Sequence, residues 1–217
     1  MRPANASPAP ADAPLGLLLA AGLGSRFSAA GGAGAKLLAP LRQGPEAGLP
    51  LAFVAARRLR AALPRVVAVL RDTDSAAVGA PPTLADWLRR AGCEVMACPE
   101  SERGMGATLA AAVRAHAAPH GWLVALADMP AIAPATIQAL AALLDNPEAI
   151  VAPRHAGRRG HPVGFGAAHG AALGALDGER GAAALLERHP VHWLDTLDAG
   201  VLYDVDRPED LDGTAPR

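Results

Sequence analysis

Short apolar segments alternate with alanine-rich helical segments along most of this sequence, and this alternation restricts the possible folds more than any other feature. The segments 15–20, 66–70 and 122–127 are apolar without interruption, as expected for strands that are buried on both faces. The residues at 51–63 and 104–118 have the composition of helices. Alternating strands and helices predict an α/β layer fold with a largely parallel sheet.

The same pattern predicts the limits of the folded region. Further strands are expected over 93–98, 149–152 and 162–165, and further helices over 84–91 and 134–144. With 217 residues the chain is long enough for one domain with a full core. We expect residues 1–14, which are rich in proline and alanine, to be a disordered lead-in, residues 15–212 to form a single domain, and residues 213–217 to be a frayed tail.

Composition excludes several classes of function. Hydrophobic residues make up 51% of the chain, but no apolar run approaches the roughly 20 residues of a membrane span. The net charge of −1 gives no general field for nucleic acid, so any phosphate binding must be local. Cys93 and Cys98 flank a predicted strand at a spacing that fits neither a metal site nor a redox pair. A location in the reducing cytoplasm is therefore expected.

A glycine-rich loop follows the first predicted strand. Gly22 and Gly24 let the backbone approach a ligand closely, and Arg26 adds a positive charge. Lys36 is the only lysine in a chain that otherwise uses arginine, and a compact ammonium suits phosphate binding. The loop lacks the full dinucleotide fingerprint, because position 27 is phenylalanine, and it is not a Walker A loop. We interpret it as a triphosphate-binding loop.

Carboxylates follow the predicted strands elsewhere. Asp128 comes directly after a buried strand, where a carboxylate can hold Mg²⁺ together with phosphate oxygens and water, and it lies too early to cap the helix that begins at Pro134. Asp204 and Asp206 lie on the same face of an extended chain. Asp206 is either a second metal ligand or the cap of a helix that starts at Pro208, and the pattern favours neither.

Two further segments have the composition of binding loops. Arg158 and Arg159 lie between glycines and precede His161, which indicates either a mobile basic loop that faces an anion or, for the arginines, a solvated turn. The segment 99–108 opens a helix whose N-terminus could receive a base edge or a phosphate. Thr108 in that helix either contacts the ligand or satisfies the helix backbone.

Taken together, these segments resemble the MobA-like nucleotidyltransferase family, and most of all its molybdenum cofactor cytidylyltransferase branch. The resemblance extends from about Leu15 to Leu211. Several blocks in the family's order carry it, and together they are more specific than any one block. They are Leu19–Arg26, Lys36–Leu41, Gly104-Met105, Asp128-Met129-Pro130, Arg159–Val163 and Asp204–Leu211.

The resemblance implies a Rossmann-like three-layer nucleotidyltransferase fold and the transfer of CMP from CTP to the phosphate of molybdopterin, with Mg²⁺ as cofactor and pyrophosphate as product. Molybdenum hydroxylases of the xanthine dehydrogenase type are the implied recipients of the product. The opening block Ala20-Ala21-Gly22 is similar to that of the cytidylyl branch, whereas guanylyl relatives tend to have Ala-Gly-Gly.

The residues and the resemblance together give one site assignment. Lys36, Arg26 and Asp128 are assigned to catalysis, and Asp128 and Asp206 to the metal. Arg159, His161 and Pro162 are assigned to the acceptor. The residues assigned to the nucleotide are Leu19, Ala20, Ala21, Gly22, Gly24, Ser25, Arg26, Lys36, Gly104 and Thr108.

Two departures from the family pattern qualify this assignment. The link between Arg26 and Lys36 is long, and as a flexible insert it would weaken the preorganisation of the loop. The family block Gly-Asp-x-Gly-Ala-Arg is present with Glu179 in place of its aspartate and Ala183 in place of its arginine.

The alternatives to this function are the same chemistry with another nucleotide or a sugar-phosphate acceptor, and a non-catalytic protein that binds or matures the molybdenum cofactor.

Overall fold

The first predicted strand, Leu15–Leu19 (β1), lies in the middle of an eight-stranded sheet in the computed structural model, which describes residues 13–22, 24–32, 34–71 and 80–212. The sheet order is β3-β2-β1-β4-β7-β5-β6, and β8 pairs with β5. The other strands are β2 (Val66–Leu70), β3 (Glu94–Ala97), β4 (Trp122–Leu126), β5 (Ile150–His155), β6 (Arg158–Arg159), β7 (Val163–Phe165) and β8 (His192–Asp195).

The central strands of the sheet are parallel, as the alternation of strands and helices predicts. β1 pairs in parallel with β2 and with β4, so that Leu17 lies opposite Val67 and Val124, and β2 pairs in parallel with β3. The short strand β7 departs from this pattern, because it runs antiparallel to both β4 and β5. The carboxyl ends of β1, β2 and β4 therefore meet at one edge of the sheet, where ligands bind in open α/β sheets.

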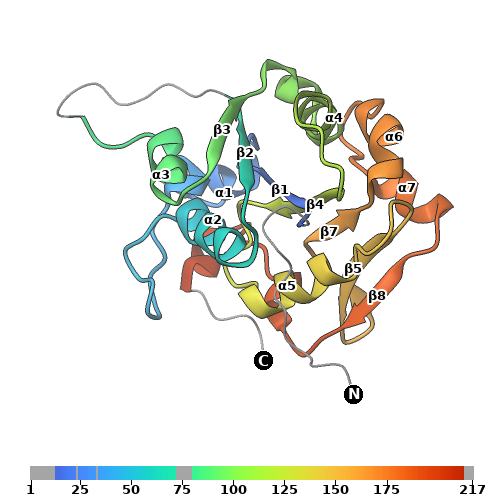
Figure 1. Ribbon diagram of the computed structural model, residues 1–217. Helices are drawn as coiled ribbons and strands as arrows, with labels where there is room; N and C mark the ends of the chain where they lie inside the picture. The colour runs from blue at the N-terminus through green and yellow to red at the C-terminus, as the bar shows by residue number, and fades with distance from the viewer. Residues whose placement is uncertain (1–12, 23, 33, 72–79, 213–217) are drawn as a thin grey trace.

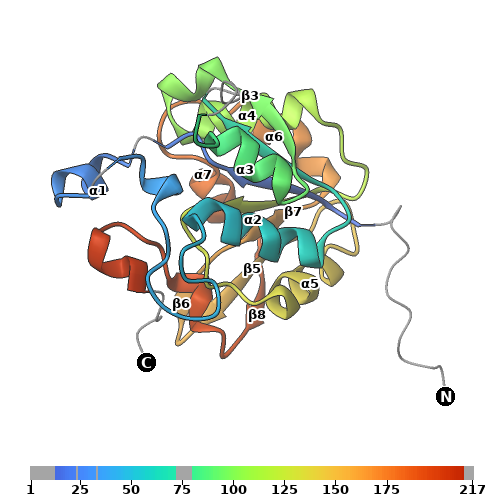
Figure 2. The same ribbon diagram turned by 90° about the vertical axis from the view of Figure 1, so that its left-hand side faces the viewer.

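Helices cover both faces of the sheet, and the fold is the Rossmann-like three-layer arrangement expected from the sequence (Figures 1 and 2). One face carries α2 (Leu51–Ala62), α3 (Leu84–Arg90) and α5 (Pro134–Ala142). The other carries α4 (Met105–Ala115), α6 (Gly170–Gly174) and α7 (Ala183–Arg188). Short 3-10 turns complete the described part: η1 (Lys36–Leu38), η2 (Pro99–Arg103), η3 (Ala167–His169), η4 (Ala199–Leu202) and η5 (Pro208–Asp212).

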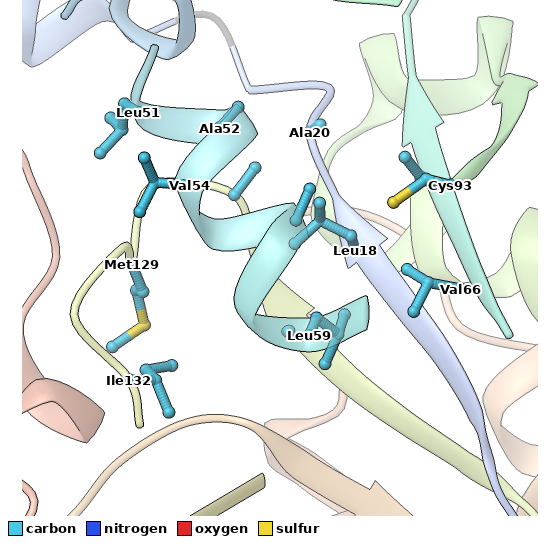
Figure 3. Close-up of a cluster of buried hydrophobic side chains, with 14 of the residues drawn as sticks. Leu18, Ala20, Leu51, Ala52, Val54, Leu59, Val66, Cys93, Met129 and Ile132 are labelled. Atoms are coloured by element: carbon cyan, nitrogen blue, oxygen red, sulfur yellow. The ribbon is translucent and has the colours of Figure 1, made fainter. Parts of the chain in front are cut away.

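Each face of the sheet has its own hydrophobic core, and β1 contributes to both. Leu18 and Ala20 belong to the core beneath α2, whereas Leu17 and Leu19 belong to the core beneath α4. Figure 3 shows the first of these cores, in which Leu59 of α2 lies over the sheet. This burial on both faces explains why the strand segments contain apolar residues in succession instead of alternating apolar and polar residues.

The long link between Arg26 and Lys36 is partly folded, contrary to the expectation of a flexible insert. Its first part is helix α1 (Ser25–Ala29), in which Phe27 is 2% exposed and belongs to the core beneath α2. The backbone N–H of Gly32 donates to the carbonyl of Phe27 at 3.0 Å, which turns the chain back on itself. Ala33 lies outside the described residues. Phe27 thus anchors the link, and Lys36 follows it at the start of η1.

Some sequence expectations concern segments that the structure does not describe or settles only in part. Most of the expected lead-in, residues 1–12, and the whole expected tail, residues 213–217, lie outside the described residues. Within the described ranges, no helix is both long and apolar enough to span a bilayer. Cys93 and Cys98 are buried free thiols. Burial raises the pKa of Cys93 to about 12, so its thiol stays protonated near neutral pH.

Candidate nucleotide-binding site

A cavity of about 420 Å³ lies at the carboxyl edge of the sheet. Its walls come from the loop after β1, the ends of β2 and β4, the turn η2, the start of α4, and two segments near the C-terminus. The side chains and backbone that line it are Leu19, Ala21, Gly22, Gly24, Ser25, Arg26, Phe27, Lys36, Leu37, Arg71, Ser101, Glu102, Gly104, Met105, Thr108, Leu126, Asp128, Glu179 and Asp206.

Four charged side chains bind one another at one end of this cavity, which we call the paired end (Arg26, Lys36, Asp128 and Asp206). The Lys36 ammonium Nζ donates to Oδ2 of Asp128 at 2.8 Å and to Oδ1 of Asp206 at 3.2 Å. Arg26 Nη1 donates to Oδ2 of Asp206 at 3.0 Å. The sequence assigned these residues to catalysis or metal binding, and the fold brings all four together although 180 positions separate Arg26 from Asp206.

The backbone explains why the paired end assembles. Asp128 lies two residues after the end of β4, and its carbonyl accepts a hydrogen bond from the N–H of Val205 at 3.0 Å, which places Asp206 beside it. On the other side, a Cβ atom on Gly24 would lie 2.8 Å from Cβ of Lys36, so only glycine lets the loop approach the lysine so closely. Figure 2 shows α1 beside the C-terminal turn η5, which follows Asp206.

The ion pairs set the protonation states at the paired end. Burial favours a lower pKa for Lys36, but the carboxylates of Asp128 and Asp206 outweigh it, and the pKa of the lysine is raised. Burial favours a higher pKa for Asp206, but Lys36 and Arg26 hold that pKa below its usual value. The Lys36 ammonium and the Asp206 carboxylate are therefore both charged near neutral pH.

Asp206 is not the helix cap that the sequence left open as an alternative. Its side chain binds Lys36 and Arg26, and Asp210 Oδ2 accepts instead from the N–H groups of Asp206 and Arg207, at 2.9 and 2.8 Å. Asp204 is exposed to solvent. Partial burial raises the pKa of Asp204, and the nearby carboxylates of Asp206 and Asp128 add to this effect. Asp206 is thus the member of the predicted pair that faces the lysine.

Asp128 keeps one acceptor free for a ligand. Its Oδ1 atom is buried and has no hydrogen-bond partner within the described residues, while Oδ2 binds Lys36. A buried carboxylate oxygen is normally satisfied, so this atom fits a divalent cation. Across the described ranges, no group of three or more His, Cys, Asp and Glu side chains is placed to hold a metal. Asp128 and Asp206 would therefore need oxygens from phosphate or water, as Mg²⁺ sites commonly do.

The wall opposite the paired end comes from η2, the start of α4 and the loop between α6 and α7. It contains Ser101, Glu102 and Glu179, which the sequence analysis did not assign to the cavity. Thr108 lines this wall too, but its hydroxyl donates to the carbonyl of Gly104 at 2.9 Å, so it satisfies the helix backbone. The N–H of Gly106 donates to the carbonyl of Gly178, at 2.7 Å.

Arg71 is a further cavity residue that the sequence analysis missed. It follows β2 directly and lines the cavity, where its Nη1 lies 3.3 Å from Oε1 of Glu102. The rule that singled out Asp128, namely a polar residue immediately after a buried strand, would have found it. Ser101 lies in the segment 99–108, which the sequence already indicated as a binding segment, and Glu179 lies in the altered family block. Neither side chain was assigned to the cavity, because a 3-10 turn places Ser101 there and loop docking places Glu179.

Most residues assigned to the nucleotide line this cavity, but those assigned to the acceptor do not. Ala20 is the exception among the former, because it lines a second cavity of about 360 Å³ on the other side of the glycine loop. Arg159 is exposed on β6, and Pro162 is buried before β7. Neither residue, nor His161, belongs to the walls of the first cavity.

His161 lies near the paired end without lining the cavity. The Nδ1 atom of its ring is buried and has no hydrogen-bond partner among the residues described. The backbone N–H of His161 donates to the carbonyl of Val201 at 2.9 Å. Burial and the charge of Arg159 lower the pKa of His161 to about 4, against an opposing effect of Asp128. The imidazole is therefore neutral near pH 7.

A parallel sheet with a glycine loop, one lysine and two carboxylates at its carboxyl edge is an arrangement that suits a phosphate-bearing ligand. The sequence matches the model of the MobA-like NTP transferase domain over residues 16–193, and the chain belongs to that family. It is therefore a nucleotidyltransferase, a transferase enzyme that uses a nucleoside triphosphate.

Solved structures give the same fold. The protein Rv0371c of Mycobacterium tuberculosis is 27% identical, with a TM-score of 0.67 over 91% of this chain and 95% of that one. A manganese complex of Rv0371c matches with a TM-score of 0.63 at 26% identity, over 91% and 95% of the two chains. A nucleotidyl transferase from Methanothermobacter thermautotrophicus, 19% identical, has a TM-score of 0.69 over 92% of this chain and 94% of that one. A comparison with curated proteins found no significant match.

Proposed function

We propose that this enzyme transfers CMP from CTP to the phosphate of molybdopterin and releases pyrophosphate. The observation that carries the proposal is the paired end of the cavity, where Lys36 and Arg26 meet Asp128 and Asp206 at the carboxyl edge of the sheet. Two cations can bind the phosphates of a nucleotide, and two carboxylates can hold the cation that accompanies them. The cytidylyl assignment is supported by the block Ala20-Ala21-Gly22.

In the proposed reaction, an oxygen of the acceptor phosphate attacks the α-phosphorus of CTP in line with the leaving group. A bond forms between that oxygen and the α-phosphorus, the bond from the α-phosphorus to the bridging oxygen breaks, and pyrophosphate leaves with the electron pair. The acceptor is already anionic near pH 7, so no strong base is needed. Catalysis then depends on position and on charge neutralisation by Lys36 and Arg26.

Asp128 and Asp206 are the residues that would hold Mg²⁺. The unpartnered Oδ1 of Asp128 fits this role, because it is a buried acceptor that only a cation or a donor can satisfy. The manganese complex of the related Rv0371c supports a divalent cation in this family. When bound, Mg²⁺ supplies charge neutralisation of the phosphate oxygens. Lys36, which binds both carboxylates, is then available to the phosphates.

Arg159, His161 and Pro162 remain our candidates for the acceptor. They lie outside the cavity that holds the paired end, as expected if donor and acceptor approach the α-phosphorus from different sides. His161 is neutral near pH 7, so Arg159, which is exposed, would supply the positive charge toward an anionic acceptor. The product would pass to a molybdenum hydroxylase of the xanthine dehydrogenase type.

The proposal is tested by pyrophosphate release from CTP, GTP, ATP and UTP, each with molybdopterin, with the molybdenum-loaded cofactor, with a sugar phosphate, and without acceptor. We expect release with CTP only when molybdopterin or its loaded form is present, and a dinucleotide product by mass spectrometry. Pyrophosphate release with a different nucleotide, or with the sugar phosphate as acceptor, would show that the enzyme uses that substrate instead. Cofactor binding without pyrophosphate release from any nucleotide would instead indicate a non-catalytic maturation protein.

A further inference from the structure

The wall opposite the paired end holds a hydroxyl that has no partner. Ser101 is only 8% exposed, and its Oγ atom is buried without a hydrogen-bond partner among the described residues. The backbone holds this side chain in place, since the N–H of Ser101 donates to the carbonyl of Cys98 at 3.0 Å within the turn η2. A buried hydroxyl at a cavity wall that binds nothing in the protein is available to a ligand.

Glu179 brings a carboxylate to the same wall. The loop between α6 and α7 docks on the start of α4 through the bond from Gly106 to Gly178 and through the ion pair of Arg103 with Asp177, at 2.6 Å. This docking is so close that a Cβ atom on Gly104 would lie 2.8 Å from the carboxyl carbon of Glu179. The carboxylate is therefore held at the cavity although it is exposed to solvent.

The charge of Glu179 is not neutralised by the nearby arginines. Arg103 pairs with Asp177, and Arg71 pairs with Glu102. Glu179 itself makes no hydrogen bond or ion pair to another side chain in the part of the chain that the structure describes, and the adjacent Arg180 pairs with Glu187. An ionised carboxylate can only accept hydrogen bonds. The Glu179 carboxylate repels the phosphates of a nucleotide, which are drawn to the cations of the paired end. It attracts an N–H donor on a part of the nucleotide that is distant from the phosphates.

We propose that Glu179 and Ser101 recognise the base of the nucleotide, and that the carboxylate of Glu179 accepts from an exocyclic amino group so that cytosine is selected over uracil. This inference rests on the proposed function, because it presupposes a nucleotide whose phosphates lie at the paired end. Cytosine presents an amino group where uracil presents a carbonyl, and a carboxylate is a known acceptor for that amino group. The Ser101 hydroxyl can donate to the neighbouring ring nitrogen of cytosine.

The test is calorimetric titration of CTP and of UTP into the full-length protein in the presence of Mg²⁺. We expect the Kd for CTP to be at least about tenfold lower than that for UTP, the scale of one specific base contact. Glu179→Gln should reduce this ratio to about one, because the amide can donate to the uracil carbonyl. Ser101→Ala should weaken CTP binding severalfold. Glu187→Gln is the matched control, since Glu187 lies on α7 and outside the cavity wall, and it should retain the wild-type ratio.

Each other outcome has a distinct meaning. Equal affinities of the wild-type protein for CTP and UTP would overturn base recognition by Glu179 and leave nucleotide binding intact. A preference for CTP that Glu179→Gln does not change would overturn it too. Failure to bind any nucleoside triphosphate would overturn the proposed function itself. Circular dichroism of each variant verifies folding, and the exposed position of Glu179 makes its substitution compatible with a folded protein.

Discussion

The two ends of the cavity differ in how their polar groups are satisfied. At the paired end, two cations and two carboxylates bind one another at 2.8 to 3.2 Å. At the opposite wall, the buried hydroxyl of Ser101 has no hydrogen-bond partner, and Glu179 is in no ion pair, among the described residues. A ligand must therefore replace existing ion pairs at one end, whereas at the other it satisfies groups that are open. The comparison suggests that the paired end governs turnover and the opposite wall governs the choice of ligand.

The largest effect should come from breaking the paired end. Lys36→Ala removes a side chain that is 9% exposed and whose ammonium binds both carboxylates. We expect kcat to fall by about 10²- to 10³-fold, equal to a few kcal/mol of transition-state stabilisation, as for the loss of one oxyanion donor. The measurement is pyrophosphate release at saturating CTP and Mg²⁺.

Arg42→Ala is the control for the loss of a basic residue, because Arg42 pairs only loosely with Asp212, at 3.9 Å, and lies outside the cavity wall. It should keep wild-type turnover. If Lys36→Ala also kept wild-type turnover, the catalytic assignment of the lysine would be wrong, and with it the contrast between the two ends.

A second test concerns His161, whose buried Nδ1 atom has no hydrogen-bond partner among the described residues. Its folded-state pKa of about 4 lies below the usual 6.5, so the unfolded chain binds a proton first as the pH falls. The free energy of unfolding should therefore decrease as the pH drops from 6.5 towards 4, by at most about 3 kcal/mol. Urea titrations at a series of pH values measure this loss.

The matched variant is His161→Gln, which cannot titrate in this range. Its free energy of unfolding should fall less between pH 6.5 and pH 4 than that of the wild-type protein. Parallel pH profiles for the two proteins would show that another group causes the loss of stability in acid. Protonation of the His161 imidazole would then not be what destabilises the folded protein.

The opposite wall can be tested through Gly104. This residue has a φ of 112°, and an added Cβ would lie 2.7 Å from the carbonyl oxygen of Gly178. Gly104→Ala should lower the free energy of unfolding by about 2 kcal/mol, because backbone strain and the displacement of the docked loop add together. Thermal and urea denaturation measure the loss, and the affinity for CTP should fall with it.

Gly44→Ala separates the two causes. Gly44 also has a positive φ, 81°, but no atom lies within 4 Å of its added Cβ. We expect a loss of about 1 kcal/mol from strain alone, with unchanged affinity for CTP. Equal losses at both positions would mean that the contact between Gly104 and the docked loop contributes little, and that Glu179 is not held by it.

The smallest effect should come from Asp198, a paired carboxylate outside the cavity. Its Oδ2 accepts from the N–H of Ala133 and the hydroxyl of Thr136, at 2.8 and 2.7 Å, at the start of α5. Asp198→Ala should cost about 1 kcal/mol of stability, as the loss of a helix cap does, with no change in CTP affinity by calorimetry. A large loss of affinity would show that pairing outside the cavity also controls the site.

The sequence predicted the sheet and the meeting of Asp128 with the Lys36 loop because both follow from local pattern. Buried strands have continuous apolar residues, and the carboxyl ends of parallel strands meet at one edge, so Asp128 and the loop before Lys36 were expected to converge there. The antiparallel direction of β7 was not predicted, since three apolar residues, Val163–Phe165, fit either direction.

The part of the opposite wall that contains Glu179 depends on tertiary contacts that no local pattern encodes, whereas the segment 99–108 was indicated by the sequence. Glu179 reaches the cavity because the loop that contains Gly178 docks on Gly106 at the start of α4. These two segments are far apart in the chain. Asp206 illustrates the same limit on a smaller scale. Its sequence context allowed a helix cap or a metal ligand, and only the structure shows that Asp210 binds the backbone N–H groups in its place.

The single lysine also makes this chain a selective target for chemical labelling. The sequence has one ε-amine, that of Lys36; two carboxylates keep it protonated, and its side chain is nearly buried. An amine-reactive reagent that carries a nucleotide should be guided to that amine, because a protonated, shielded ammonium reacts slowly unless the reagent is delivered to it. The stoichiometry of modified Lys36 in a mass spectrum would then count occupied sites directly, without an assay of turnover.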